Sequence, residues 1–395
     1  MAHLVVGWEL GHGMGHIMPL RMLAEVLLEK GHQLTFIVRD VSAAQRALEG
    51  LDVVWLQTPQ VTYRPWEMTR TDCYSQLLGN IGFRDPEKLM STVTGWRSLL
   101  SALQPDAALL EFAPSAMIAC YMEDIPFALQ GNGFFCPPAE EQPFGVISNK
   151  LPEDQRRHQD AMLLDSINTV IGNSRPALGH VSELYRLSCL NVLTSFRELD
   201  HFCRDNDEVF RGVWVPSIPI SPRWPKGEGK RIFAYLTARP GVDKVLAMLS
   251  RTGLPTLVYC PGVEGKFRAP FENQKCRFLD GLVDIKKLAE QSSLGVFHGN
   301  HSSTAMFMLA GTPTMQIPLY MEQLMFARRI KSLGTGEIAT LDQPQRIAAG
   351  MNAIMSNPGY GESARRFADQ YRDYDQNFAI RQAAADLEVA LGLSA

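Results

Sequence analysis

The stretch from Phe297 to Gln323 contains small polar residues at a point where a buried strand gives way to a helix. Its apolar pattern predicts a helix from about Ser303 to Ala310, which Gly311 ends. The first backbone N–H groups of a helix lack intrahelical partners and carry positive potential, so a helix start stabilises a diphosphate. Side chains in the same turn can add hydrogen-bond donors, namely His298, Ser302, Ser303 and Thr304.

A plain structural role for this turn is the alternative. Ser303 can be an ordinary N-cap, and His298 can simply fill the end of the strand. One loop further on, Glu322 and Gln323 carry groups that can bind the hydroxyls of a sugar. The residue types alone therefore leave both a ligand site and a structural turn open.

A second group of chemically capable residues lies near the amino terminus. Gly11, Gly13 and Gly15 form a turn after the apolar strand His3–Trp8, and His16 opens the helix that follows. The glycines lack G-x-G-x-x-G spacing and therefore predict no nicotinamide site. An imidazole titrates near neutral pH, so His16 can act as a general base toward a hydroxyl.

Such a base needs a countercharge, because the start of a helix disfavours an imidazolium. Glu111 ends a predicted strand that begins at Ala107, and its carboxylate can hold the far ring nitrogen of His16. The alternatives are a capping or packing role for His16 and a solvated Glu111. His12 is a second candidate for the base.

The elements that must position these residues follow an alternation of short apolar runs and helical patterns, which is typical of βαβ units. A proline- and glycine-rich linker, 216–230, separates two such halves, and a long polar helix is predicted from about Pro358 onward. Ligands bind beyond the carboxyl ends of parallel strands, where both residue groups fall. The remaining predicted strands are 34–38, 53–56, 126–130, 192–195, 213–215, 231–236, 256–260, 277–279, 294–298 and 314–317.

Composition narrows the class of protein. With 395 residues, two domains are the default, and a net charge of −4 argues against nucleic acid as the main partner. The seven cysteines show no C-x-x-C pair, which favours reduced thiols over a disulfide framework or a zinc site. With no signal peptide and no spanning segment evident in the sequence, we expect a cytoplasmic protein that can contact a membrane peripherally.

The stretch from Phe297 to Gln323 resembles the donor-binding motif of the UDP-glycosyltransferase-like (GT1) superfamily, which is His-Gly-Gly-x-Gly-Ser/Thr, then Glu, Gly-x-Pro and Asp-Gln. The matching residues are His298-Gly299, Ser303, Gly311-Thr-Pro313 and Gln323, with Glu322 in place of the Asp. Gly15-His16-Ile-Met-Pro19 resembles the Gly-His-x-x-Pro element of the same enzymes, whose His is the general base. The resemblance assigns that role to His16, with Glu111 as its partner.

Besides Glu322, five positions depart from the family pattern. Asn300 and Ser302 replace glycines, and Met306 replaces a Glu that contacts ribose hydroxyls, which leaves room for a dTDP donor beside a UDP donor. Thr237-Ala238 stands where the family has a phosphate-contacting Gly-Ser or Gly-Thr, so Arg239 is a candidate for that contact. The full set of donor-binding candidates is His298, Gly299, Asn300, His301, Ser302, Ser303, Thr304, Glu322, Gln323, Val283 and Arg239.

The resemblance implies an α/β protein of the GT-B fold, with two Rossmann-like parallel-sheet domains facing a cleft. We expect an acceptor domain at 1–220, a donor domain at 221–357 and C-terminal helices at 358–395 that cross back to the first domain. The implied activity is inverting transfer from a UDP- or dTDP-sugar to a hydroxyl of a small-molecule, lipid or natural-product acceptor. No metal is expected, and the protein would be a monomer or homodimer.

Two other functions remain open. One is a nucleotide-sugar epimerase on the same fold, which needs no acceptor. The other is a non-catalytic sugar-nucleotide-binding or regulatory protein. The departures from the family pattern at Asn300, Met306 and Thr237-Ala238 favour this alternative. The acceptor itself is not evident, because the long stretches 58–104 and 137–159 match no acceptor motif.

Overall fold

A computed structural model describes residues 1–62, 68, 70–139, 144–205 and 207–393. The chain forms two units. Unit 1 comprises Met1–Trp214 together with Asp375–Ala395, and unit 2 comprises Val215–Tyr374. The predicted domain boundary after residue 220 falls inside the linker that unit 2 includes.

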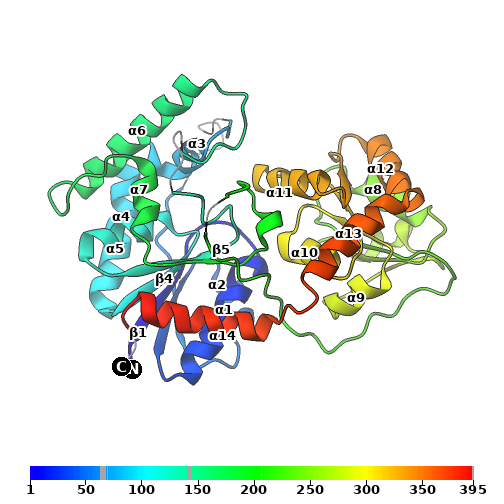
Figure 1. Ribbon diagram of the computed structural model, residues 1–395, viewed down its shortest axis with the longest axis horizontal. Helices are drawn as coiled ribbons and strands as arrows, with labels where there is room; N and C mark the ends of the chain where they lie inside the picture. Colours follow the sequence, from blue (N-terminus) through cyan, green and yellow to red (C-terminus); the bar gives the residue numbers. More distant parts are fainter. Residues whose placement is uncertain (63–67, 69, 140–143, 206, 394–395) are drawn as a thin grey trace. The chain divides into compact units, whose positions relative to one another are not determined.

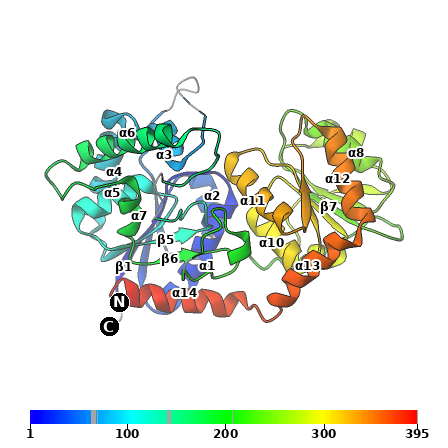
Figure 2. The same cartoon turned by 45° about the horizontal axis from the view of Figure 1, so that its top comes forward.

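Unit 1 is built on a six-stranded parallel sheet in the order β3-β2-β1-β4-β5-β6. Apolar side chains fill its strands because helices cover both faces: α1, α2 and α14 on one, and α4, α5 and α7 on the other (Figures 1 and 2). The strands are β1 (His3–Trp8), β2 (Gln33–Val38), β3 (Val54–Gln57), β4 (Ala107–Glu111), β5 (Phe127–Gly131) and β6 (Asn191–Leu193).

The helices of unit 1 follow the predicted alternation with the strands. They are α1 (Met14–Glu29), α2 (Val41–Ala47), α3 (Tyr74–Leu78), α4 (Pro86–Leu103), α5 (Pro114–Glu123), α6 (Glu153–Ile171), α7 (Val181–Arg186) and α14 (Gln376–Ala390), with a π-helical turn, Gly79–Phe83, between α3 and α4.

Unit 2 repeats the plan with a second six-stranded parallel sheet, in the order β12-β11-β10-β7-β8-β9. Its strands are β7 (Ile232–Tyr235), β8 (Thr256–Tyr259), β9 (Cys276–Phe278), β10 (Leu294–Phe297), β11 (Thr314–Gln316) and β12 (Gly336–Ile338). Its helices are α8 (Val242–Ser250), α9 (Ile285–Gln291), α10 (His301–Leu309), α11 (Met321–Ser332), α12 (Pro344–Ser356) and α13 (Pro358–Gln370).

Four sequence predictions need correction. The segment 213–215 is not a strand: Val213 and Trp214 are buried in unit 1, so their apolar character reflects packing rather than sheet pairing. Strand β12 was not predicted, because Gly336-Glu-Ile is too short to show an alternation. Helix α10 begins at His301 rather than near Ser303.

The fourth correction concerns the long polar helix predicted from about Pro358 onward, which is interrupted and forms two helices, α13 and α14. Helix α13 belongs to unit 2 and α14 to unit 1. The break follows from burial: Ile380, Ala383, Ala384 and Leu387 enter the hydrophobic core of unit 1, which α14 shares with α1. Asp375 then caps α14 by accepting hydrogen bonds from Asn377 N and Phe378 N.

Candidate active site and donor-binding loops

Both groups of candidate residues lie where the strand order of a sheet reverses. In unit 1 the order reverses between β1 and β4, which are neighbours with Trp8 opposite Glu111. In unit 2 it reverses between β7 and β10. Parallel sheets bind ligands at the carboxyl ends of strands at such a switch point.

His16 and Glu111 form a buried hydrogen-bonded pair. The His16 ring comes from the first turn of α1, and its Nδ1 lies 2.8 Å from Glu111 Oε1. His16 is 8% exposed and Glu111 3%. Burial raises the pKa of Glu111 above its usual value, and the opposing effect of the neighbouring His16 imidazole only partly offsets this rise. A carboxylate here orients Nδ1–H toward itself and leaves Nε2 as the proton acceptor.

Gly11 keeps the space beside Nε2 open. Its φ of 82° lies in the left-handed region, and a Cβ at this position would lie 2.2 Å from His16 Nε2. Any side chain larger than hydrogen would therefore occupy the approach to the free nitrogen. The turn thus needs a glycine for both its backbone conformation and the access to His16.

Two aromatic rings contact His16, although the sequence predictions did not associate them with it. Trp8 stacks on the imidazole with ring centroids 5.5 Å apart, and the Phe135 ring lies at 4.9 Å. Trp8 ends β1, so its place beside the β1–α1 turn could have been read from the strand pattern. Phe135 is distant in sequence and follows a different strand, β5, so no local pattern indicates its contact.

Glu9 is a further buried carboxyl group beside this site. Its Oε2 accepts hydrogen bonds from the backbone N–H groups of Ser115 and Ala116, at 3.0 and 3.4 Å, where α5 begins. Burial nevertheless raises the pKa of Glu9 from its usual value near 4.5 to about 7. This carboxyl group therefore titrates near neutral pH inside unit 1.

The turn between β10 and α10 leaves the helix start without a side-chain cap. Asn300 occupies the N-cap position, but its Oδ1 accepts from His298 N at 3.1 Å instead of from the first turn of α10, and no cap hydrogen bond from its side chain is found in the described structure. Ser302 and Ser303 lie half-buried in the first turn. The backbone N–H groups of that turn suit an anion.

Two of the predicted donor residues face the protein instead. His298 is buried, its Nδ1 donates to Ile317 O at 2.7 Å, and burial lowers its pKa. In that neutral form Nε2 carries no proton, so the predicted donation to a phosphate is not supported. Thr304 is fully buried and hydrogen-bonds Gln316 Nε2, which ties α10 to β11.

The loops after β7, β10 and β11 meet at this edge of the sheet. Gly299 has a φ of 87°, and a Cβ there would lie 2.8 Å from the Cβ of Gln323. Gln323 Oε1 accepts from Leu319 N at 2.9 Å, so its side chain closes its own loop. Arg239 donates from Nη2 to Tyr320 Oη at 2.5 Å, and Tyr320 is an exposed aromatic residue that the sequence did not single out.

The other candidates lie around these loops. Glu322 is in the first turn of α11. The His301 ring contacts Phe326 at 4.8 Å. Val283 packs against the cluster that contains Phe297 and Phe307, so it contributes apolar surface rather than a polar contact.

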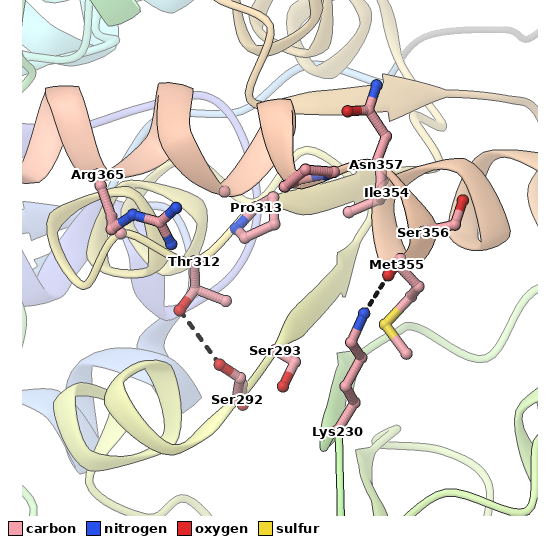
Figure 3. Close-up of a pocket in the computed structure, with 13 residues that line it drawn as sticks. Lys230, Ser292, Ser293, Thr312, Pro313, Ile354, Met355, Ser356, Asn357 and Arg365 are labelled. Carbon is pink, nitrogen blue, oxygen red and sulfur yellow. Dashed lines mark hydrogen bonds between the residues drawn. The ribbon is translucent and has the colours of Figure 1, made fainter.

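A separate pocket of about 380 Å³ opens at the other end of the unit 2 sheet, before the amino ends of β7, β10 and β11 (Figure 3). Its polar side chains are largely engaged within the protein. Thr312 donates to the Ser292 carbonyl at 3.3 Å, and Lys230 donates to the Met355 carbonyl. This pocket is distinct from the α10 turn.

Among the described residues, no three His, Cys, Asp or Glu side chains gather as a metal site would require. None of the described helices is long and apolar enough to cross a membrane.

Searches against known proteins give structural matches but no sequence match. No family model matches the chain, and no curated protein does. The spinosyn rhamnosyltransferase SpnG matches with a TM-score of 0.68 at 15% identity, over 98% of this chain and all of that one. The calicheamicin glycosyltransferase CalG4 has a TM-score of 0.70 at 17% identity, over 100% and 99% of the two chains.

The glycosyltransferase VinC in complex with dTDP matches with a TM-score of 0.68 at 12% identity, over 99% of this chain and 100% of that one. These similarities extend over both units and both sheets, so the prediction of the fold is confirmed: the chain has the two-domain α/β GT-B fold of these glycosyltransferases.

Proposed function

We propose that this protein is an inverting glycosyltransferase that moves a sugar from a nucleoside-diphosphate sugar to a hydroxyl of a small-molecule, lipid or natural-product acceptor. The observation that carries the proposal is the buried pair of His16 and Glu111, joined at 2.8 Å, with Nε2 kept accessible by Gly11. A non-catalytic protein has no need for an oriented base in this arrangement.

In the reaction, His16 Nε2 takes the proton of the acceptor hydroxyl as the oxygen attacks the anomeric carbon of the sugar. The bond from that carbon to the diphosphate oxygen breaks, and the diphosphate leaves with the electron pair. The transition state is oxocarbenium-like, as in glycoside hydrolysis. Glu111 stabilises the imidazolium through Nδ1–H.

Unit 2 would bind the donor at the amino end of α10. The uncapped first turn supplies backbone N–H groups for the diphosphate, with Ser302 and Ser303 beside it. Arg239 would add a positive charge from the loop after β7. Glu322 and Gln323 would bind sugar hydroxyls, Gln323 also holding its own loop.

We expect dTDP as the nucleotide. The family pattern has a Glu at position 306, whose carboxylate accepts hydrogen bonds from the ribose hydroxyls of a UDP donor. The thioether of Met306 is a much weaker acceptor. Two structurally similar proteins, VinC and SpnG, are described in complex with dTDP and thymidine diphosphate. CalG4 and SpnG are named for calicheamicin and spinosyn, which favours a natural-product acceptor.

Nucleotide binding and transfer are tested separately. A thermal-shift panel of dTDP, UDP and GDP should show stabilisation that is greatest with dTDP. Incubation of dTDP- and UDP-sugars with a panel of hydroxylated aglycones, followed by mass spectrometry, should show transfer that His16→Ala lowers by about 10² to 10⁴-fold. His16→Ala should keep nucleotide binding, because the α10 turn is in unit 2.

The competing functions have their own outcomes. Conversion of a sugar nucleotide without any acceptor would identify an epimerase. Nucleotide binding without turnover in either reaction would favour a regulatory protein. Full transfer by His16→Ala would remove the base assignment.

A further inference from the structure

The contact between Phe135 and the His16 ring depends on a tight turn. Residues Asn132–Cys136 follow β5, and Asn132 Oδ1 accepts from Phe134 N at 2.9 Å and from Phe135 N at 3.3 Å. The Asn132 carbonyl also accepts from the N–H groups of Phe135 and Cys136, both at 3.1 Å. This turn carries Phe135 to within 4.9 Å of the imidazole and 4.7 Å of the Phe112 ring.

A buried ion pair from a later segment holds the same turn. Arg204 Nη2 donates to the carbonyls of Gly133, at 3.1 Å, and Cys136, at 2.7 Å. Its Nε donates to Asp200 Oδ2 at 3.1 Å, and its Nη1 to Glu208 Oε2 at 2.6 Å. The side chains of Arg204 and Asp200 are 2% and 0% exposed.

The turn and the ion pair fit each other closely. A Cβ added to Gly133 would lie 1.8 Å from Asp200 Oδ1, so only glycine leaves room for the carboxylate. Asp200 Oδ2 also accepts from Arg204 N at 2.9 Å. We call Asp200, Arg204 and the Asn132–Cys136 turn the Arg204 clamp.

Such a buried pair is weak evidence for stability as such. Removing two charges from water costs several kcal/mol, and apolar residues of similar volume often serve stability as well or better. The guanidinium instead fixes the geometry of the turn, because its planar N–H donors hold the carbonyls of Gly133 and Cys136 at the same time. The residue that this turn presents to His16 is Phe135.

We propose that the Arg204 clamp is a positioning device for the base: it holds Phe135 against the His16 imidazole and thereby keeps Nε2 aligned for proton abstraction. Glu111 fixes one ring nitrogen, Trp8 stacks on the ring at 5.5 Å, and Phe135 supplies the further contact that limits tilting of the ring. This inference rests on the proposed function, in which His16 takes the proton.

A double-mutant cycle tests the coupling. Phe135→Ala and Arg204→Met should each lower kcat/KM for the acceptor by roughly 10- to 100-fold, because a small misplacement of a catalytic group has that cost. Nucleotide affinity, a property of unit 2, should not change. If Arg204 acts through Phe135, the double variant should match Phe135→Ala within about twofold rather than multiply the two losses.

A matched control is Tyr121→Ala. Tyr121 is also a half-buried aromatic residue of unit 1, but it lies on α5, outside the Arg204 clamp, and its Oη donates to Pro176 O at 2.9 Å. It should leave the kinetics near those of the unaltered chain. Should Arg204→Met fail to fold with Asp200 unpaired, the combined variant Asp200→Asn and Arg204→Met removes both charges and takes its place in the cycle.

The second readout does not depend on activity. It is the NMR signal of the His16 Nδ1–H proton in protein with ¹⁵N-labelled histidine, assigned by its loss in His16→Ala. We expect this proton to give a low-field signal that is protected from exchange with solvent. This signal should broaden or exchange faster in Phe135→Ala and Arg204→Met, and persist in Tyr121→Ala.

The outcomes separate the two claims. Losses that multiply in the double variant, or an unchanged His16 signal in both single variants, would overturn the positioning role. A disturbed signal in a protein that transfers no sugar would contradict the proposed function, whereas the structural coupling of Arg204 and Phe135 to the His16 ring would still hold.

Discussion

At the residue scale, the Glu111 carboxylate determines which nitrogen of His16 would act as the base in the proposed reaction. Because Oε1 accepts from Nδ1, Nε2 remains free for the acceptor proton. Glu111→Gln keeps the shape of the side chain but replaces the charge with an amide, which stabilises an imidazolium less and can hold the wrong tautomer.

We expect Glu111→Gln to lower kcat by about 10² to 10⁴-fold with little change in nucleotide affinity. Transfer rates and nucleotide titrations on the same preparations measure this. Glu29→Gln, at the exposed end of α1, is the matched control. A Glu111→Gln protein with normal kcat would mean that the carboxylate only packs against His16.

Glu9 predicts a pH dependence of stability. Its folded pKa of about 7 lies above its usual value near 4.5, so between these values the folded chain holds a proton that the unfolded chain has lost. The free energy of unfolding therefore falls by on the order of 3 kcal/mol as pH rises through this window. Above pH 7 it levels off.

Glu9→Gln keeps an acceptor for Ser115 N and removes the ionisation. We expect it to flatten the decline of unfolding free energy between pH 5 and pH 8, as measured by urea denaturation, with the exposed Glu49→Gln as control. Equal slopes for Glu9→Gln and the unaltered chain would show that Glu9 does not titrate in this range.

At the element scale, the start of α10 depends on the residue before its cap. Gly299 adopts a left-handed φ of 87°, and the loop of Gln323 lies against it. A methyl group at Gly299 would lie 2.9 Å from the Gln323 carbonyl oxygen, which a rigid backbone cannot easily relieve. The turn and the loop after β11 must then separate.

Gly299→Ala should weaken nucleotide binding by at least tenfold and lower the melting temperature. Gly253→Ala is the matched control, because Gly253 also has a left-handed φ, of 70°, but no atom lies within 4 Å of an added Cβ. Both variants carry the backbone cost of about 1–2 kcal/mol, so only the difference between them reports the contact. Equal nucleotide affinities would mean that the turn does not bind the donor.

The accuracy of the sequence predictions also differs by element. Periodicity located β10 and the helix after it, but not the residue at which α10 begins, because Asn300 turns its side chain back to His298 N. His16 and Glu111 were predictable, since each ends or follows a strand that the apolar pattern marks. Phe135 and Arg204 were not, because their roles depend on contacts between segments distant in sequence.

At the scale of the whole molecule, the similarity to known glycosyltransferases lies in the fold alone, at 12–17% identity for the matches with SpnG, CalG4 and VinC. The order of strands in each sheet is one that alternating strands and helices with right-handed crossovers can form, but the alternation alone does not determine it. The return of the chain to unit 1 in α14 was expected from the resemblance rather than from any pattern in the residues.

The stability of unit 1 should depend on this last helix. Leu387 is fully buried in the unit 1 core, so Leu387→Ala should cost about 2–5 kcal/mol and lower the unfolding temperature of unit 1. Calorimetry, with nucleotide added to mark the transition of unit 2, measures this. Val389→Ala, at a side chain 75% exposed on the same helix, should have little effect, and similar losses for both variants would contradict the packing of α14.

Unit 1 is discontinuous along the chain, since 160 residues of unit 2 separate Trp214 from Asp375. During synthesis from the amino terminus, the α1 surface that α14 covers therefore stays exposed until residues 376–390 leave the ribosome. Unit 2 is therefore complete before unit 1. A chain interrupted by premature termination near residue 375 would thus contain all of unit 2 but a unit 1 that lacks α14.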